Sequence, residues 1–470
     1  MHSSCGNIAV WWNNLRNGEY YMKFTNIGPI KNANLTLGQL TIFSGGNNQG
    51  KTYITYAIYG VLKELTARYE LLDVEQAEIF LSENKYTFSK EEFNKAYANF
   101  IVSTIRKSSN RILSKVFSSG IKTFEDSEIL LDPQEVIEMI GLTRTEHFRK
   151  QIEFRNILFI FELAEKTISV SYLKKSQNSG LNTEEMLPEE FTLDRRFLNM
   201  VFSLIIQDYI SNSFNYIYVP AERTGINVFS KELHNGRANF IDDLSTLDED
   251  DEKIIKSIRE RKSTYPQPVD EYVKYLNSLE DYDIMINESN KISQIIRDKM
   301  IGGRFGFDKE KGTAYFKLKD DSKVSLHMAS SSAKSLYGLD YYLDSILGDN
   351  TNNFIIIDEP EINLHPSNQI EFAVLINYLI ESGVNLIIST HSDFLMKKLA
   401  NLALLNKIKK QPGISRENTK IYNFENQTLS EIDYFNKDNV FENFDKNYQN
   451  LENEYFNLVD LMHEEIEDEL

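Results

Sequence analysis

The chain has 470 residues, 41% of them hydrophobic and 26% charged, and its formal net charge is −19. That length allows two or three domains with a large buried core. The negative charge argues against a protein that coats nucleic acid without sequence preference. No run of about 18 apolar residues is present, so no membrane span is predicted. No basic stretch followed by apolar residues opens the chain, so no secretory signal is expected.

Cysteine occurs once, as Cys5. One cysteine excludes a disulfide framework and a cysteine-rich zinc site, and it suits a reducing compartment. We therefore expect a cytoplasmic protein.

The first predicted element begins near Met22, and residues 1–21 are interpreted as an N-terminal extension. Residues 22–27 and 33–37 predict two strands joined by a Gly-Pro turn. Residues 40–43 predict a third strand, and after a glycine-rich turn the 3–4 spacing of apolar residues predicts a helix over 53–69.

Residues 70–214 are mostly helical by pattern, with one candidate strand at 156–161. Because heptads are not sustained, a compact helical insertion is predicted rather than a long coiled coil. A strand at 216–220 returns the chain to a sheet, and residues 240–300 predict a helical sub-insertion. A hairpin is predicted over 304–318, turning at Lys309 to Gly312.

Strands and helices alternate after residue 350: strands at 354–357 and 386–389, helices at 367–381 and from Asp393. This alternation predicts an α/β fold whose mostly parallel sheet has helices on both faces. The domain prediction is an N-terminal lobe at 22–69, the insertion at 70–214, a C-terminal lobe at 215–425 and an acidic tail at 426–470.

Thirteen acidic residues and two lysines lie between Glu431 and Leu470. Such a tail is either a solvated helix or frayed end, or an interaction segment for a basic partner.

Gly45 to Thr52 match the pattern G-x-x-x-x-G-K-[ST] at every required position. Glycines let the backbone curl so that successive N–H groups face phosphate oxygens, and the following helix adds its positive N-terminal end. Lys51 is predicted to reach the β- and γ-phosphates, and the Thr52 hydroxyl to bind Mg²⁺. The alternative is an ordinary glycine turn. The phosphate-binding candidates in this loop are Gly45, Asn47, Asn48, Gln49, Gly50, Lys51 and Thr52.

Asp358 and Glu359 directly follow the buried strand at 354–357. The carboxyl ends of parallel strands are where such sheets place their chemistry. Asp358 is predicted to hold Mg²⁺, directly or through water, and Glu359 to polarise the attacking water. His391 follows the next buried strand; it is either a γ-phosphate contact or a structural histidine.

Asp358 to Pro366, followed by Ser389 to Ser392, resembles the ABC-type ATPases of the OLD and SMC-like group. The similarity extends to ATPase subunits of bacterial antiviral systems such as Septu PtuA and the PARIS ATPase, and Phe24 to Ile30 fits the same group. The motifs lie near both ends of the chain, and the middle is matched only by position. The resemblance implies an ABC-ATPase head that binds ATP and Mg²⁺.

The same resemblance implies a homodimer or higher homo-oligomer in which two protomers enclose two ATP molecules. Glu361 to Pro366 would form the dimer-facing loop, and a serine-containing signature would reach the partner's γ-phosphate. The best match to that signature is Ser330, Ser331 and Ser332 before a predicted helix. The usual glycine is missing, with Ala333 near its place and Lys334 beside it, so a plain serine helix cap is the alternative.

The glutamine that senses Mg²⁺ in this group has no obvious counterpart. Glu222 or Arg223, at the end of the strand at 216–220, takes that role or forms an ordinary ion pair.

Three functions remain open. The first is an ATPase and sensor subunit of an anti-phage system that switches a separate effector nuclease of HNH or Toprim type. The nuclease is expected on another chain because too few residues follow Phe424 for the Toprim domain of OLD chains and because no nuclease motif is found. The second is a RecF- or SMC-like repair ATPase that clamps DNA, and the third is an ATP-binding scaffold with weak hydrolysis. A DNA clamp needs a basic face, and candidates are Arg106, Lys107, Arg111 and Lys115, or Arg144, Arg149, Lys150 and Arg155.

Overall fold

The computed structural model describes residues 20–67, 74–140, 147–154, 157–174, 194–211, 214–233, 265–279, 294–308, 313–346, 352–433 and 454. The predictions for residues 1–19, most of the helical sub-insertion at 240–300, the turn at 309–312, Arg144, Arg155 and the tail beyond residue 433 (apart from 454) lie outside the described residues.

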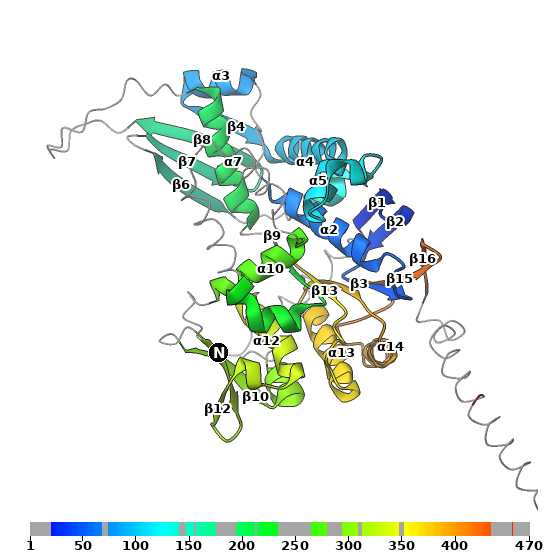
Figure 1. Cartoon of the computed structure of the whole chain (residues 1–470). Helices are drawn as coiled ribbons and strands as arrows, with labels where there is room; N and C mark the ends of the chain where they lie inside the picture. The colour runs from blue at the N-terminus through cyan, green and yellow to red at the C-terminus, as the bar shows by residue number, and fades with distance from the viewer. Residues whose placement is uncertain are drawn as a thin grey trace, which may run out of the picture.

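A six-stranded sheet forms the centre of the molecule (Figure 1). Its order is β16-β15-β3-β14-β13-β9, and every neighbouring pair is parallel except β15 and β16. The prediction of an α/β fold with a mostly parallel sheet is therefore confirmed. The strands are β3 (Leu40–Gly45), β9 (Phe214–Val219), β13 (Asn352–Asp358), β14 (Asn385–Ser389), β15 (Thr419–Glu425) and β16 (Thr428–Glu431).

Alternate residues of the central strands enter two different hydrophobic cores. Phe354 and Ile356 of β13 pack into the core that holds α2 (Lys51–Leu65). Ile355 and Ile357 point to the opposite core, which contains buried residues of α10 (Gln267–Ser278), α12 (Ser331–Ile346), α13 (Pro366–Glu381) and α14 (Asp393–Lys409). Each of these side chains is at most 1% exposed, and burying one contributes about 1.5–3 kcal/mol. A strand buried on both faces is thus why the sequence runs Phe-Ile-Ile-Ile without alternation.

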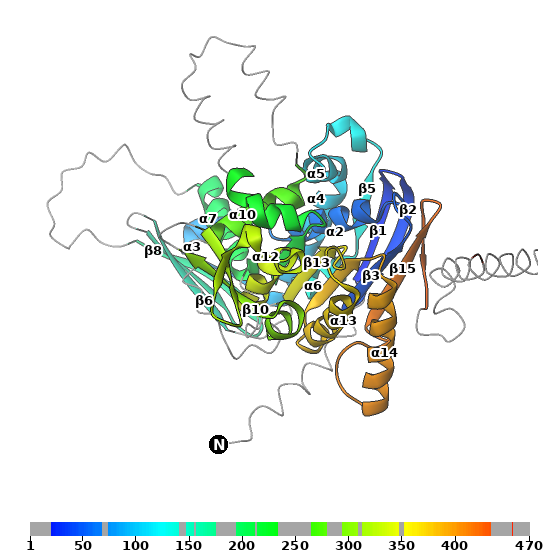
Figure 2. The ribbon, with the colours of Figure 1, turned by 60° about the horizontal axis from the view of Figure 1, so that its bottom comes forward.

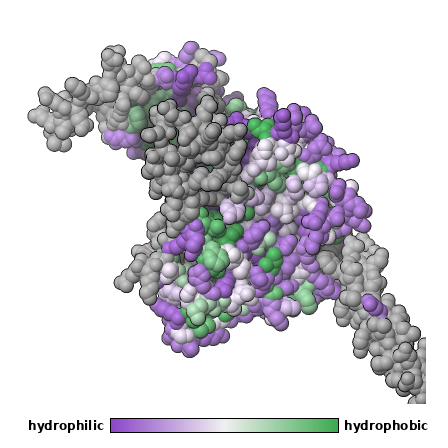
Figure 3. Space-filling view, viewed as in Figure 1, coloured by the Kyte–Doolittle hydropathy of each residue, from purple (hydrophilic) through white to green (hydrophobic). Residues whose placement is uncertain are grey.

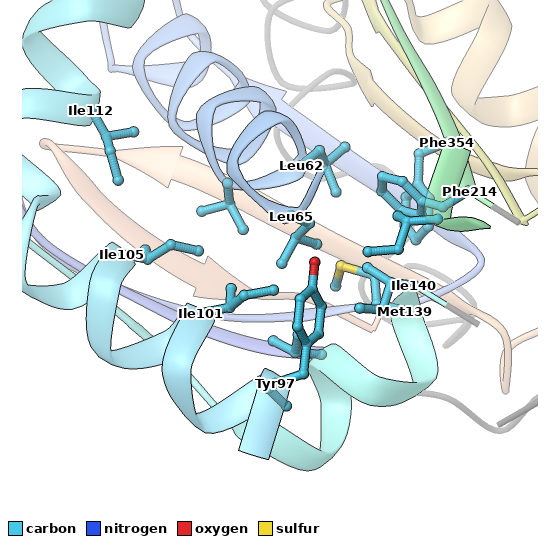
Figure 4. Close-up of a cluster of buried hydrophobic side chains, with 14 of the residues drawn as sticks. Leu62, Leu65, Tyr97, Ile101, Ile105, Ile112, Met139, Ile140, Phe214 and Phe354 are labelled. Carbon is cyan, nitrogen blue, oxygen red and sulfur yellow. The ribbon is translucent and has the colours of Figure 1, made fainter. Parts of the chain in front are cut away.

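The core beneath α2 continues into the insertion. Figure 4 shows Leu62 and Leu65 of α2 above Ile101 and Ile105 of α4 (Lys90–Lys107), and Tyr97 of α4 lies in the same cluster. Met139 and Ile140 close the cluster from the end of α6 (Pro133–Met139). The helix that follows the glycine-rich loop is therefore packed between the sheet and the insertion.

The prediction of a mostly helical insertion over 70–214 is incomplete: the described part holds helices, and the candidate strand at 156–161 is confirmed as β7 (Ile157–Leu163), but further strands lie beside it. The order β4-β8-β7-β6 makes a four-stranded antiparallel sheet, which Figure 1 shows beside α7 (Arg195–Ser211). Burial alternates along β7, as expected of a strand with one covered face. The remaining elements are α3 (Val74–Glu83), α5 (Ser109–Val116), β4 (Lys85–Ser89), β5 (Glu128–Leu131), β6 (Phe148–Phe154), β7 (Ile157–Leu163) and β8 (Thr167–Lys174).

The insertion is also tied to the N-terminal strands. β1 (Tyr20–Ile27) pairs on one side with β2 (Ile30–Leu37) and on the other with β5. Figure 2 shows these strands beside β3 and β15. The two predicted N-terminal strands are confirmed, and the third strand of their sheet comes from the insertion.

The predicted hairpin is also confirmed, as β10 (Gly303–Asp308) and β11 (Thr313–Leu318), with β12 (Lys323–Ser325) added to it. It follows a short π-helix, Ile295–Ile301, and precedes α12. On the face shown in Figure 3, hydrophilic and hydrophobic residues are interspersed over the coloured part of the surface. Within the described residues, no helix is both long and apolar enough to cross a bilayer.

Candidate functional site

Three neighbouring parallel strands end at the same edge of the central sheet. β3 runs into Gly45, β13 ends at Asp358 and β14 ends at Ser389. Because β14 pairs with both β3 and β13, the segments that follow these strands are adjacent. The three predicted motifs, far apart in the chain, thus meet at one sheet edge.

Two glycines of the loop after β3 adopt backbone angles that favour glycine. φ is +127° at Gly45 and +109° at Gly50, a region that L side chains rarely enter. A Cβ on Gly45 would lie 2.4 Å from the carbonyl oxygen of Phe424, and one on Gly50 would lie 2.7 Å from Cδ1 of Ile30. Both glycines are therefore required by the curl of the loop and by the close approach of neighbouring segments.

The Lys51 side chain folds back over the loop and is only 6% exposed. Its Nζ donates to the carbonyl oxygens of Gly45 at 3.0 Å and Gly46 at 2.8 Å. Burial lowers the pKa of Lys51, while the nearby carboxylates, Glu359 first, act in the opposite direction. The loop thus holds the Lys51 ammonium group against its own carbonyl oxygens and near the carboxylates of Asp358 and Glu359.

Asp358 is a buried carboxylate surrounded by hydroxyl groups. Its Oδ1 accepts a hydrogen bond from Ser389 Oγ at 2.7 Å, and its Oδ2 accepts one from the Tyr218 hydroxyl. Thr55 Oγ1 lies 3.3 Å from Oδ1. Burial is the largest influence on Asp358 and raises its pKa, which these hydrogen bonds oppose.

Glu359 is held in a left-handed conformation with φ of +46°, which a non-glycine residue adopts only where its surroundings enforce it. Its amide donates to the carbonyl oxygen of Ser389 at 3.0 Å. Its Oε1 lies 3.7 Å from Nε2 of His391. The structure therefore brings Glu359 and His391 together beside Lys51, which influences the pKa of that histidine.

The loop that carries His391 is fixed by Glu361. Glu361 Oε1 accepts a hydrogen bond from the His391 amide at 2.6 Å, and its Oε2 accepts one from Thr390 Oγ1 at 3.0 Å. Burial raises the pKa of Glu361, and the His391 amide opposes this. Glu361, which sequence reasoning placed only in a dimer-facing loop, also positions the segment after β14.

Arg223 does not form the ordinary ion pair that was one of the two roles considered for it from the sequence. Its buried guanidinium donates to the carbonyl oxygens of Asp358 at 3.0 Å, Glu359 at 3.1 Å and Pro360 at 3.0 Å. It therefore binds the backbone of the loop that carries Glu359 instead of forming an ion pair. Glu222 beside it is exposed. Tyr218 is the residue that sequence reasoning missed here, and only its place in a predicted strand pointed toward it; Arg223 was singled out, but not for binding this backbone.

The serine segment lies at the N-terminus of α12. Ser330 Oγ accepts a hydrogen bond from the Ala333 amide at 3.2 Å, so Ser330 caps the helix. Ser332 Oγ donates to the carbonyl oxygen of Asn363 at 2.9 Å, and Ser331 is exposed. Asn363 in turn donates to Thr224 Oγ1 at 2.8 Å. The serine segment is thus anchored to the loop after β13, with Ser331 directed to the surface.

The residues present fit a nucleotide phosphate chain. Within the described part of the chain, the backbone amides of residues 47–52 donate no hydrogen bond, and residues 46–48 are exposed. They are followed at once by the N-terminus of the 15-residue helix α2. Free amides, a helix N-terminus and the Lys51 ammonium together match an anionic ligand.

The oxygens present also fit a hard divalent cation. Thr52 supplies a hydroxyl at the start of α2 and Asp358 a carboxylate at the end of β13, which are the oxygen ligands that Mg²⁺ prefers. No positively charged side chain donates to the Asp358 carboxylate among the described residues. A bound cation would therefore supply the positive charge that the hydroxyl partners of Asp358 do not.

His391 is expected to make stability depend on pH. Burial, and then the charge of Lys51, lower the pKa of His391 below its ordinary value of 6.5. Below that value the unfolded chain binds a proton that the folded protein does not, so the free energy of unfolding falls as pH falls toward the folded pKa. Urea unfolding at pH 7.5 and 5.5 should show a larger acid loss for the wild type than for His391→Asn. Equal losses for both proteins would contradict this prediction.

Three of the basic residues considered for a nucleic-acid face have acidic partners. Arg106 pairs with Glu128 at 2.7 Å. Arg149 and Lys150 of β6 pair with Glu162 at 3.1 Å and Asp208 at 3.0 Å. These pairs reduce the positive charge available to a phosphate backbone.

Comparison with known proteins places residues 22–396 in the family described as AAA ATPase domain. Comparison with curated proteins finds no match. Similar solved structures include the Smc head domain bound to the C-terminal domain of ScpA from Pyrococcus furiosus, at 12% identity and a TM-score of 0.33, covering 88% of this chain and 95% of that one. The SMC head domain from Thermotoga maritima has 11% identity and a TM-score of 0.33, covering 88% and 97%.

At these TM-scores the two structural similarities support no functional conclusion. The family match spans β1 through the start of α14 and includes all three motifs that meet at the sheet edge. The chain belongs to the AAA ATPase domain family.

Proposed function

We propose that this protein binds ATP with Mg²⁺ at the edge where β3, β13 and β14 end, and hydrolyses it to ADP and phosphate. The observation that carries the proposal is the convergence of Lys51, Glu359 and His391 around a loop whose amides are free. Family membership supports an ATPase, and the geometry supports the assignment of individual residues.

Each residue then has a chemical task. The amides of residues 47–52 and Lys51 hold the phosphates, and Thr52 and Asp358 would hold Mg²⁺. Bound there, the cation offsets charge that builds on the phosphate oxygens. Glu359 accepts the proton of the attacking water, and His391, 3.7 Å from Glu359, contacts the γ-phosphate. Burial and the charge of Lys51 lower the pKa of His391 and so favour its neutral ring, which donates from one nitrogen only.

Replacing Lys51 with alanine tests the nucleotide site. The loss of a partly desolvated ammonium–phosphate contact costs about 2–5 kcal/mol, so ATP affinity should fall roughly 30- to 5,000-fold. Equilibrium binding of a fluorescent ATP analogue measures this. Lys63→Ala is the matched control, because Lys63 is on the same helix but pairs with Glu271. Equal affinity of Lys51→Ala and wild type would refute the site.

The proposal extends to a homodimer or higher homo-oligomer in which ATP lies between protomers. Support comes from Ser331, which is exposed at the N-terminus of α12, a helix terminus able to bind phosphate. Ser332 is bonded to Asn363 in the loop that the resemblance assigns to the dimer contact. Closure by ATP and opening by hydrolysis would make the nucleotide a switch.

The biological role proposed for that switch is an ATPase and sensor subunit of an anti-phage system that acts with a separate nuclease. It is supported by the resemblance of Asp358 to Pro366 and Ser389 to Ser392 to such subunits. Co-expression with the neighbouring genes should lower phage plating, and Lys51→Ala should abolish the protection. Protection that persists in Lys51→Ala, or salt-sensitive DNA binding without any protection, would count against this role.

A further inference from the structure

The carboxylate of Asp358 is oriented by hydrogen-bond donors on both of its oxygens. Ser389, at the end of β14, donates to Oδ1 at 2.7 Å. Tyr218, near the end of β9, donates to Oδ2, and among the described residues it is the only donor to that oxygen. Two donors on opposite oxygens fix rotation about the Cβ–Cγ bond, so the plane of the carboxylate is set by strands on both sides of β13.

Thr55 does not replace Tyr218 in this arrangement. Its hydroxyl carries one proton and has three acceptors within reach: the Thr52 carbonyl at 3.2 Å, the Tyr218 hydroxyl at 2.9 Å and Asp358 Oδ1 at 3.3 Å. The acceptor on Asp358 is Oδ1, which already has Ser389. Without the phenol, Oδ2 would have no donor.

The phenol is itself placed by the helix that follows the glycine-rich loop. The Tyr218 ring lies 5.2 Å from the Tyr56 ring and 5.9 Å from the Tyr59 ring, both in edge-to-face geometry. A tyrosine hydroxyl carries one proton, and here that proton is donated to Oδ2 of Asp358. The position of the phenol thus depends on α2, which also carries Lys51 and Thr52.

We propose that Tyr218 is a positioning residue for the metal site: its hydroxyl holds Asp358 Oδ2 so that the carboxylate faces Mg²⁺ together with Thr52. The inference rests on the proposed Mg²⁺–ATP site and adds to it a residue 140 positions before Asp358 in the chain. Loss of such an outer partner of a metal ligand typically weakens metal binding about 10- to 100-fold.

The test measures how the affinity for a fluorescent ATP analogue rises with Mg²⁺ from its value in EDTA. The quantity compared is the Mg²⁺ midpoint, the concentration at which half of that rise has occurred. Tyr218→Phe, which keeps the ring and removes only the hydroxyl, should raise that concentration about 10- to 100-fold while leaving affinity in EDTA unchanged. Tyr216→Phe is the matched control, since it removes a phenol two residues earlier on the same strand that bonds to Thr66. A purely structural role would lower stability without moving the Mg²⁺ midpoint.

Two further variants keep the outcome decisive. Asp358→Asn should abolish the Mg²⁺ enhancement; if it does not, the metal role of Asp358 fails, and the inference fails with it. If Asp358→Asn acts but Tyr218→Phe has the wild-type midpoint, only the role of Tyr218 is refuted. Should Tyr218→Phe fail to fold, Thr55→Val, which removes the hydroxyl 2.9 Å from Tyr218, must shift the midpoint in the same direction, and an unchanged midpoint overturns the inference.

Discussion

Glu359→Gln should lower the rate of ATP hydrolysis by about 10²- to 10⁴-fold, the range attributed to a general base. The glutamine side chain has nearly the same shape as that of glutamate. The backbone amide of residue 359 can keep its hydrogen bond to the Ser389 carbonyl, and φ can stay at +46°. What the variant loses is the carboxylate that we propose accepts the proton of the attacking water. ATP binding should remain, so the variant should accumulate the ATP-bound, associated form.

Two measurements on that variant separate these effects. Steady-state phosphate release gives the rate, and light scattering after size exclusion, with and without ATP, gives the oligomeric state. Glu381→Gln, an exposed carboxylate at the end of α13, is the control and should behave as wild type. Hydrolysis at the wild-type rate would remove Glu359 from the role of base, and an unchanged oligomeric state would remove ATP from the role of the dimer switch.

Arg223→Met should be the most disruptive single change in the loop after β13. Methionine fills similar space but leaves the carbonyl oxygens of Asp358, Glu359 and Pro360 without the donor they now share. Each unsatisfied buried acceptor costs about 1–3 kcal/mol; with partial relaxation, unfolding should become easier by roughly 3–5 kcal/mol. Hydrolysis should fall at least about tenfold, since a small displacement of a catalytic group is sufficient for that.

Urea unfolding and steady-state hydrolysis together test this expectation. Arg416→Met is the matched control, because Arg416 is largely exposed and pairs with Asp433 at the surface; such a change usually alters stability by less than about 0.5 kcal/mol. Arg223→Lys should fall between wild type and Arg223→Met, since an ammonium cannot reproduce the fork of the guanidinium. If Arg223→Met unfolds at the wild-type urea concentration, the guanidinium is not what holds the loop.

The sequence predicted the glycine-rich loop and the residues after β13 and β14 because each motif is short and its spacing is set by local chemistry. Tyr218 and Arg223 could not be predicted in the same way. Tyr218 reaches Asp358 because β9 pairs with β13 in the register that aligns Tyr218 with Ile356. That register depends on the packing of the whole sheet, and a tyrosine in an apolar strand is otherwise an ordinary core residue.

Strands β6 and β8 of the insertion were not predicted, for a different reason. Charged and polar residues interrupt the apolar ones along β6 and β8, and at this density both a helix face and a half-covered strand fit the sequence. Pairing with neighbouring strands decided between them, as β6 and β8 flank the more apolar β7. Non-local pairing of this kind is not visible in the periodicity of one segment.

The strand order of the central sheet also fixes when the site can first exist. β3, which carries Gly45, lies between β14 and β15 in the sheet. Both of these neighbours come from the last part of the sequence that forms the sheet, at Asn385–Ser389 and Thr419–Glu425. During synthesis at about 5–20 residues per second, the loop at residues 45–52 would wait roughly 20–75 s for residue 425 to be translated. An incomplete chain on the ribosome therefore has the glycine-rich loop but lacks the neighbouring strands that shape it. We expect the nascent protein to bind no nucleotide until β14 and β15 have been synthesised.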